Sequence, residues 1–293
     1  MKLSIALLLA IASIAVAHPA NVHVNCANNS TASEDIEKRA GAGKRGLAWP
    51  WYNAPLDVGK FKKTGNPVNV IYDWETYLPP STNGKSGLNY IGMQRCLDCD
   101  SSPIAQLAAR QKELGFATVF TLNEPDLEGI SPTTAVNWYL KYINPLRIKK
   151  AIPAVTSASG PNNGLDWAKQ FVAGCAGRCY FDYINIHWYG ATLQQFKDHV
   201  KKTRSMFPKY QIVITEFALQ NPKGGQAAQI AFYKEAFKFL DPLDYVAMYF
   251  PFVASSPALF AKNDPNGAAY VGTGSTLFNN DGSVSAVGKL LLA

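Results

Sequence analysis

Two apolar segments that lead into a glutamate constrain the fold of this chain more than any other feature. The first, residues 116–122, is rich in β-branched and aromatic residues and is followed by Asn123-Glu124-Pro125. The second has the sequence QIVITEFAL and contains Glu216. Proline cannot continue a strand because it lacks a backbone N–H group. We therefore expect Glu124 to lie where a buried strand opens into a loop, with Glu216 at the end of a second such strand.

The separation of the two glutamates fits a β/α barrel. They lie about 90 residues apart, and one strand plus one helix of such a barrel takes roughly 30 residues, since eight units make about 250. The gap therefore corresponds to three repeats, from a fourth to a seventh strand. All strands of a barrel end on the same face, so we expect the two side chains to meet there.

Strand and helix patterns alternate along the rest of the chain. We expect eight strands, at residues 46–49, 68–72, 90–94, 116–122, 151–156, 183–187, 211–219 and 245–249. We expect helices at 102–114, from 131, near 165–172, and at 192–206, 227–239 and 287–292. Ser102, before Pro103, is the predicted cap of the helix at 102–114. Strict alternation implies parallel strands, which form either a barrel or a doubly wound sheet. The GxGxxG match at residues 41–46 precedes a strand instead of following one, so it is not a dinucleotide fingerprint. The sequence thus predicts an α/β fold, a single-domain (β/α)8 TIM barrel.

The motifs around the two glutamates resemble those of a known group of enzymes. NEPD after the fourth strand and TEF in the seventh are similar to the signature of the retaining glycoside hydrolases built on this barrel. The segments GLAWPWYN and HWYG resemble the fungal β-1,3-glucanases of glycoside hydrolase family 128. The resemblance begins at about Arg45 and reaches the end of the chain. It implies that Glu124 is the acid/base and Glu216 the nucleophile.

The same resemblance implies roles for residues near the glutamates. Asn123 matches the asparagine that binds the sugar 2-hydroxyl, and His187 and Tyr189 match positions that orient or hydrogen-bond the nucleophile. Many relatives have a tryptophan at the end of the eighth strand as the floor of the catalytic subsite. Here that stretch reads YFPF, so we expect one of its rings, or a tryptophan from the first two strands, to form the floor.

Aromatic side chains gather at the predicted strand ends. Aromatic residues make up 12% of the chain, and a flat ring offers an apolar face to the C–H face of a sugar. Core packing explains any single ring better, whereas several rings on one rim favour a sugar-binding groove. We expect Trp138 and Trp167, on predicted helices, to lie in the core. The predicted substrate-binding residues are Trp49, Trp51, Tyr52, Trp74, Asn123, His187, Trp188, Tyr189, Tyr249 and Phe252.

The amino-terminal segment has the pattern of a secreted protein. Lys2, an uncharged run and Ala15-Val16-Ala17 predict a signal peptide at residues 1–17. Residues 18–39 are polar, lack aromatic side chains and end in Lys38-Arg39, which predicts a propeptide or a disordered tail. Lys44-Arg45 is a second candidate cleavage site. The catalytic domain would then span residues 40–293, and the protein would be extracellular or held in the cell wall.

The cysteine and charge patterns bear on the disulfides, the metal sites and the binding partners of the chain. Four of the five cysteines form the pairs Cys96/Cys99 and Cys175/Cys179, each only a few residues apart. Such pairs can bind zinc, but an oxidising secretory route favours disulfides, so we predict two local bridges and leave zinc and other pairings as alternatives. The net charge of +7 is scattered, which favours an ordinary solvated surface over a nucleic-acid site. We expect no metal, no other cofactor, no nucleic-acid or membrane partner after signal cleavage, and a monomer.

Two functions fit these features. The first is a secreted, endo-acting β-1,3-glucanase that uses a retaining mechanism. The second is a cell-wall barrel that binds β-glucan through the same aromatic side chains but hydrolyses it little or not at all. Two intact carboxylates at the predicted spacing favour the enzyme. The β-1,3 linkage rests on the family resemblance alone.

Overall fold

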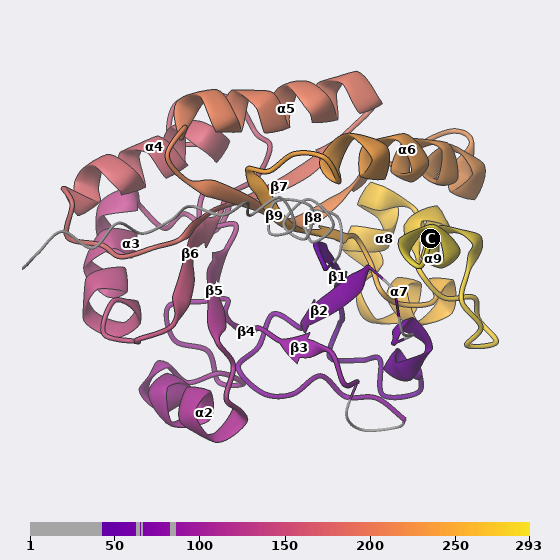
Figure 1. Cartoon of the computed structure of the whole chain (residues 1–293), viewed down its shortest axis with the longest axis horizontal. Helices are drawn as coiled ribbons and strands as arrows, with labels where there is room; N and C mark the ends of the chain where they lie inside the picture. The colour runs from indigo at the N-terminus through magenta and orange to yellow at the C-terminus, as the bar shows by residue number, and fades with distance from the viewer. Residues whose placement is uncertain (1–42, 63–64, 66, 83–85) are drawn as a thin grey trace, which may run out of the picture.

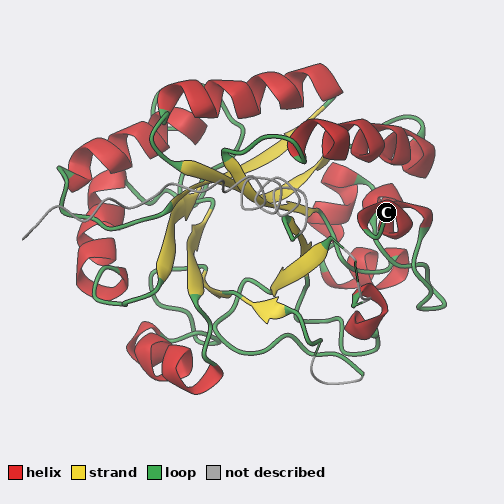
Figure 2. Ribbon diagram, in the orientation of Figure 1, coloured by secondary structure: helices red, strands yellow, loops and turns green. Residues whose placement is uncertain are grey.

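The computed structural model describes residues 43–62, 65, 67–82 and 86–293. The predicted signal peptide, the predicted propeptide and Lys38-Arg39 lie outside the described residues. Parallel strands form one sheet in the order β3-β2-β1-β9-β8-β7-β6-β5-β4, which curls into a barrel inside a layer of helices (Figures 1 and 2). The strands are β1 Arg45–Ala48, β2 Val68–Tyr72, β3 Asn89–Tyr90, β4 Gly92–Gln94, β5 Thr118–Asn123, β6 Lys149–Ala154, β7 Tyr183–Gly190, β8 Gln211–Leu219 and β9 Val246–Pro251. The prediction of a single-domain TIM barrel is confirmed.

The predicted third strand is split into two short pieces. β3 pairs with β2, whereas β4 pairs with β5. Between them, the Ile91 N–H donates to the Ile71 carbonyl at 2.9 Å, so β3 and β4 together act as one bent strand that closes the barrel. β5, β8 and β9 are therefore the predicted fourth, seventh and eighth strands. At the split, a Cβ on Gly92 would lie 2.7 Å from the Phe116 ring, which explains why glycine occupies this position.

Several helices begin at residues whose side chains cap them. Ser131 accepts a hydrogen bond from the Thr134 N–H, and Pro132 occupies the first turn of α3. Ser102 was predicted to cap the third helix, and this is wrong: its hydroxyl donates to Glu75, and Asp98 accepts from the Ile104 N–H instead. The helices are η1 Val58–Phe61, η2 Ile104–Gln106, α2 Leu107–Leu114, α3 Pro132–Trp138, the π-turn η3 Tyr139–Ile143, α4 Gly164–Cys175, α5 Leu193–Met206, α6 Gly225–Leu240, α7 Pro257–Asn263, α8 Pro265–Val271, η4 Thr273–Ser275 and α9 Ala286–Leu291.

The helical layer is uneven around the barrel. Long helices cover β5 to β9, but among the described residues only the short η1 lies between β1 and β2, and none lies between β2 and β3 (Figure 1). Loops occupy this side instead. The loops after β1 and β2 contribute Trp51, Tyr52 and Trp74 to the mouth of the barrel.

The core has two layers, as expected for a barrel. Side chains such as Tyr72, Phe120 and Phe250 fill the barrel interior, and a larger cluster lies between the strands and the helices. Trp138 and Trp167 are buried in the outer layer, as predicted. Both predicted disulfides, Cys96–Cys99 and Cys175–Cys179, are present, which confirms the local pairing. No helix in the described part of the chain is long and apolar enough to cross a membrane.

Lys44 and Arg45 fasten the start of β1 to the closing elements of the barrel. Lys44 Nζ donates to the carbonyl of Asp241, and Arg45 forms an ion pair with the Asp241 carboxylate at 2.8 Å. Arg45 also donates to the carbonyls of Leu290, Leu291 and Ala293. Both basic side chains are only 8% exposed. The Arg45–Gly46 bond, which cleavage at this candidate site would break, thus lies within strand β1 of the folded barrel, unlike an accessible cleavage site.

Candidate active site

A groove of about 1250 Å³ crosses the mouth of the barrel at the carboxyl ends of the strands. Trp51, Tyr52, Trp74, Asn123, Glu124, Tyr189, Glu216 and Phe252, all named by the sequence analysis, line this groove. Their convergence follows from the parallel strands, which all end on one face. The groove is therefore the candidate active site.

Glu124 reaches the groove through an unusual backbone conformation. Leu122 packs toward the helices, so strand alternation would point Asn123 inward and Glu124 outward. Instead the chain leaves β5 with a left-handed φ of 46° at Glu124, and its N–H donates to the Ala154 carbonyl at 2.8 Å. A positive φ is costly for a non-glycine residue and is often found at functional sites. This backbone turn points the Glu124 carboxyl at the centre of the mouth.

Glu216 reaches the groove through an irregularity in β8. Ile186 pairs with Ile214, but His187 pairs with Glu216, which leaves Thr215 as an extra residue. A bulge of this kind changes which side chains face inward. Thr215 and Glu216 consequently both point into the barrel, with Glu216 6% exposed at the floor of the groove.

His187 lies beneath the groove between the two glutamates. Its Nδ1 is 2.8 Å from Glu124 Oε1, and its Nε2 is 2.9 Å from Thr215 Oγ1 and 3.5 Å from Glu216 Oε1. Thr215 Oγ1 in turn donates to Asn185 Oδ1 at 2.7 Å. Because the threonine proton is used there, His187 Nε2–H is the donor to Thr215. His187 Nδ1 and Glu124 therefore share the remaining proton.

Glu216 accepts hydrogen bonds on both of its oxygens. The Trp74 indole N–H donates to Oε1 at 2.7 Å, and the Tyr189 hydroxyl donates to Oε2 at 2.6 Å. Burial raises the pKa of Tyr189 well above its ordinary value, so this hydroxyl remains a donor. Trp74, like Glu124, has a positive φ, 61°. Two such donors favour the ionised form of Glu216.

Burial alone shifts the pKa values of the two buried groups of the site, Glu216 and His187, in opposite directions. It raises the pKa of Glu216, and the Glu124 carboxyl adds to this, although His187, Tyr189 and Trp74 act in the other direction. Burial alone would lower the pKa of His187, but the carboxyls of Glu216 and Glu124 outweigh it and raise that pKa. Glu216 and His187 thus each bind a proton more tightly in the site than the same side chain would in water.

Glu124, His187 and Glu216 also have the donor types of a metal site, with ligand atoms within 4.8 Å of one another. The hydrogen bonds of these side chains favour a role in acid–base chemistry over metal binding. Both His187 nitrogens and both Glu216 oxygens already have partners within the protein. The arrangement is that of two hydrogen-bonded carboxyl groups, each on its own side of an imidazole.

Four predicted substrate-binding residues do not line the groove, and for Trp49, Trp188 and Tyr249 the predicted position is wrong. Trp49 is fully buried and its indole N–H donates to the Pro80 carbonyl. Trp188 points outward and stacks on Phe232 between the sheet and the helices. Tyr249 is fully buried and donates to Asp241 beside Arg45. His187 is likewise fully buried, and it contacts the two glutamates from below.

The groove also contains residues that the sequence analysis did not assign to it. Tyr270 on α8 is 47% exposed and packs edge-on against Tyr189. Arg95 and Ser101 come from the loop after β4, and Asn263 and Asn266 come from the α7–α8 region. Residues on α7 and α8 lie far beyond the end of β9, so no strand-end pattern marks them. Asp73 and Glu75 do carry that signal, because they directly follow β2.

Comparison with known proteins identifies the family. The model of the glycosyl hydrolase catalytic core family matches residues 46–291. Alkali-sensitive linkage protein 1 of Schizosaccharomyces pombe is 31% identical over 261 residues, which cover 86% of this chain and 45% of that protein. The chain therefore spans about half the length of this relative.

Solved structures show the same barrel. An endo-β-1,3-glucanase of glycoside hydrolase family 128, subgroup IV, from Lentinula edodes is 54% identical, with a TM-score of 0.83 over 86% of this chain and 99% of that one. A curdlan-specific exo-β-1,3-glucanase of subgroup III from Blastomyces gilchristii, solved with glucose, is 27% identical, with a TM-score of 0.68 over 87% and 99% of the two chains. The likeness to family 128 inferred from the motifs is confirmed, and the chain belongs to the glycosyl hydrolase catalytic core family.

Proposed function

We propose that this glycoside hydrolase is a secreted, endo-acting β-1,3-glucanase that cleaves its substrate by a retaining double displacement. The spacing of the two carboxyl groups carries the mechanistic part of the proposal. Oxygens of Glu124 and Glu216 lie within 4.8 Å of each other. Retaining glycosidases need about 5–5.5 Å between the two groups, and inverting enzymes need about 6.5–9.5 Å to hold a water molecule.

The surroundings of the two carboxyl groups support their different roles. Both Glu216 oxygens accept hydrogen bonds, which suits an ionised nucleophile held in one orientation. Among the described residues, the hydrogen-bond partner of the Glu124 carboxyl is His187, at Oε1, and the Glu124 side chain is 22% exposed, against 8% for Glu216. The protonated Glu124 carboxyl can therefore reach a leaving group in the groove.

The reaction then proceeds in two balanced steps. Glu124 gives its proton to the glycosidic oxygen while the bond from that oxygen to the anomeric carbon breaks and Glu216 forms an ester with this carbon. The ionised Glu124 next takes a proton from water, whose oxygen attacks the anomeric carbon and displaces Glu216. His187 stabilises each charge state of Glu124, because it can hold the shared proton at Nδ1.

The nature of the substrate is supported by the groove and by the relatives. The groove is open and larger than one sugar needs, and aromatic faces such as those of Trp51 and Tyr270 border it. The Lentinula edodes protein is described as an endo-β-1,3-glucanase, and its identity of 54% favours the same linkage and endo action here. The signal-peptide pattern and the two disulfides favour secretion.

The experiment that tests the proposal measures reducing ends released from a linear β-1,3-glucan, with β-1,4- and β-1,6-glucans as controls. Products of several sizes at early times would support endo action, whereas a single small product would show exo action. Proton NMR of the first product should show the β-anomer. A protein that binds the β-1,3-glucan but releases no reducing ends would instead be the glucan-binding barrel.

A further inference from the structure

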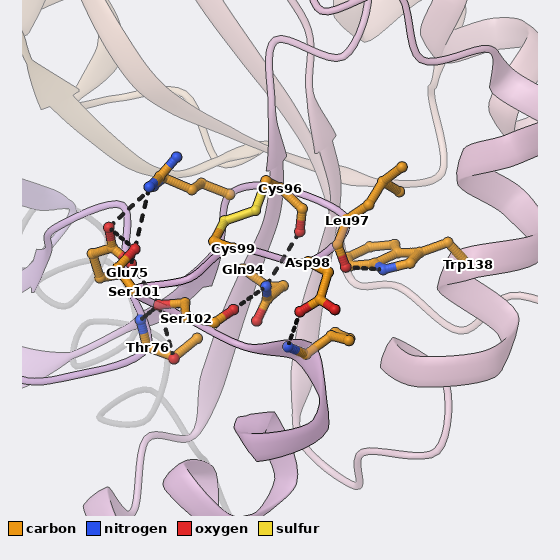
Figure 3. Close-up of a disulfide and its surroundings, with 12 residues drawn as sticks. Glu75, Thr76, Gln94, Cys96, Leu97, Asp98, Cys99, Ser101, Ser102 and Trp138 are labelled. Atoms are coloured by element: carbon orange, nitrogen blue, oxygen red, sulfur yellow. Dashed lines mark hydrogen bonds and ion pairs between the residues drawn. A yellow bond between two sulfur atoms is a disulfide. The ribbon is translucent and has the colours of Figure 1, made fainter.

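One wall of the groove is built on a disulfide-closed loop. The loop follows β4, and the Cys96–Cys99 bridge closes it (Figure 3). The Gln94 amide donates to the carbonyls of Cys96 and Ser102, and the Trp138 indole donates to that of Leu97 at 2.8 Å. The loop is therefore fixed to the barrel at both ends and in its middle.

This loop presents Arg95 and Ser101 to Glu75, and all three line the groove. Arg95 Nε donates to Glu75 Oε1 at 3.1 Å, and Arg95 Nη2 donates to Ser101 Oγ at 3.2 Å. The hydroxyls of Ser101 and Ser102 also donate to the Glu75 carboxylate, as Figure 3 shows. Both oxygens of the Glu75 carboxylate thus already accept hydrogen bonds from the protein, and this carboxylate holds the Arg95 side chain in place.

Arg95 keeps unused donors on the groove side. A guanidinium has five N–H groups, and within the described part of the chain only those on Nε and Nη2 have partners. The Arg95 side chain is 41% exposed. Its contacts are with Glu75 and Ser101, and it forms none with Glu124 or Glu216. A ligand in the groove can therefore reach the free N–H groups without replacing a hydrogen bond of the catalytic pair.

A second unused polar group lies beside this wall. Asp73 is only 1% exposed, yet its Oδ2 has no hydrogen-bond partner among the described residues, and Asp73 lines the same groove. Burial raises the pKa of Asp73 well above its ordinary value, which favours the protonated form of this carboxyl. A buried polar atom without a partner is costly unless a ligand or water satisfies it. Sugar hydroxyls, which both donate and accept, match these groups.

We propose that Arg95, anchored on Glu75 by the Cys96–Cys99 loop, forms a distal subsite that binds the hydroxyls of a glucosyl unit away from the bond that is cleaved. This inference rests on the proposed function, because it assigns the groove to a β-glucan chain. Only substrates long enough to place a sugar at the subsite gain from Arg95. The residue therefore selects for chain length.

The test separates this proposal from the proposed function. Hydrolysis of β-1,3-glucan by the unmodified protein tests the proposed function alone. Binding of linear β-1,3-gluco-oligosaccharides of increasing length is then measured by calorimetry on the Glu216→Gln protein, with and without Arg95→Met. The second change should weaken binding of the longest ligand about tenfold, equivalent to about 1.4 kcal/mol, and leave the shortest ligand that binds nearly unchanged. Equal weakening at every length, or none at any length, would overturn the proposal.

Three further variants separate binding from loop structure. Arg95→Lys keeps the charge and one set of donors and should recover part of the affinity for long ligands. Arg110 donates to Thr76, Ser101 and Ser102 without lining the groove, so Arg110→Met perturbs the loop alone. Arg204 donates to the Tyr210 carbonyl and does not line the groove. Arg204→Met is therefore the matched control for the loss of an arginine outside the groove. If Arg110→Met reproduces the length-dependent loss of Arg95→Met, Arg95 acts through the loop and not by direct contact with the sugar.

Discussion

The Nδ1 atom of His187 lies 2.8 Å from Oε1 of Glu124, the carboxyl proposed to act as acid and base. Since His187 Nε2–H is used by Thr215, this single hydrogen bond carries the proton that either partner can hold. The carboxyls of Glu216 and Glu124 raise the pKa of His187 above its ordinary value. The pH dependence of the enzyme should therefore report this imidazole.

We expect kcat/KM to follow a bell-shaped pH curve with a mildly acidic maximum. Burial raises the pKa of Glu216, so the nucleophile is lost by protonation at a higher pH than for a free glutamate, which titrates near about 4.3. On the alkaline side, activity falls when His187 loses its proton, and the carboxyls raise the pKa of His187. His187→Gln should move the alkaline limb to lower pH, because the imidazole whose pKa is raised is then absent. An alkaline limb that does not move would show that His187 takes no part in the ionisation.

Replacing Glu216 by glutamine should abolish hydrolysis and leave the fold and glucan binding intact. The amide cannot attack the anomeric carbon, so kcat should fall by about a thousand-fold or more. The measurement is release of reducing ends, with the melting temperature and glucan affinity as checks on the fold. Glu113→Gln, on the exposed surface of α2, is the matched control. Activity above a few per cent in protein free of deamidation would remove Glu216 as the nucleophile.

Replacing Glu124 by alanine should affect substrates according to their leaving groups. Hydrolysis of glucan should lose most of its rate, because a glucosyl leaving group needs the proton. Formation of the glycosyl-enzyme from an aryl glucoside with an acidic phenol should suffer far less. Azide should accelerate turnover of that substrate, and NMR should identify a β-glycosyl azide.

Other outcomes of the azide experiment would point to a different chemistry. Equal damage to both substrates, without rescue by azide, would exclude Glu124 as the acid/base. An α-glycosyl azide would indicate inversion, and the retaining mechanism would have to be abandoned.

Replacement of Trp51 should affect glucan binding, whereas replacement of Trp188 should affect the stability of the fold. Trp51 is 59% exposed at the groove, so Trp51→Ala should weaken glucan binding with little effect on the melting temperature. Trp188 is 3% exposed in the outer core, and Trp188→Ala should lower the free energy of unfolding by about 3–5 kcal/mol. Urea unfolding and glucan-binding isotherms of both variants provide the measurements. A Trp188→Ala protein of unchanged stability would contradict its assignment to the core.

The mature protein should retain Lys44 and Arg45. Both side chains are buried and fasten β1 to Asp241, so a protease that acts on the folded protein should cut after Arg39 and leave Ala40 as the first residue. Amino-terminal sequencing of the secreted protein decides the matter. A chain that begins at Gly46 would show that cleavage precedes folding, and one that begins at His18 would show that no propeptide is removed.

The barrel itself could be predicted because its signals are local. Residues 68–72 were placed correctly as a strand, and Ser131-Pro132 marked the start of α3, because apolar runs and helix caps depend on neighbouring residues alone. The split of the third strand depends on its two different partners, β2 and β5, which no local pattern records. Ser102 was assigned to a helix cap for the same reason, since its true partner Glu75 lies in another loop.

The site was predicted where a strand end determines the position of a side chain. Proline after Glu124 and the apolar run before Glu216 marked the places of the two carboxyls along the chain. The left-handed φ of Glu124 and the bulge at Thr215, which bring both side chains to the groove, have no such local signal. Trp188 was placed wrongly although the sequence held the signal: it lies between His187 and Tyr189, and alternate residues of a strand face opposite sides. Tyr270 had no such signal, because a helix beyond the last strand brings it to the groove.

The contacts of Arg45 bear on how this protein is made. Translation produces β1 early, yet Arg45 is satisfied by Asp241 and by the carbonyls of Leu290, Leu291 and Ala293, which lie 196 to 248 residues further along the chain. β1 also pairs with β9. The ring of strands therefore cannot close before β9 has been made, and a product truncated before α9 would leave the buried Arg45 guanidinium without its three carbonyl partners.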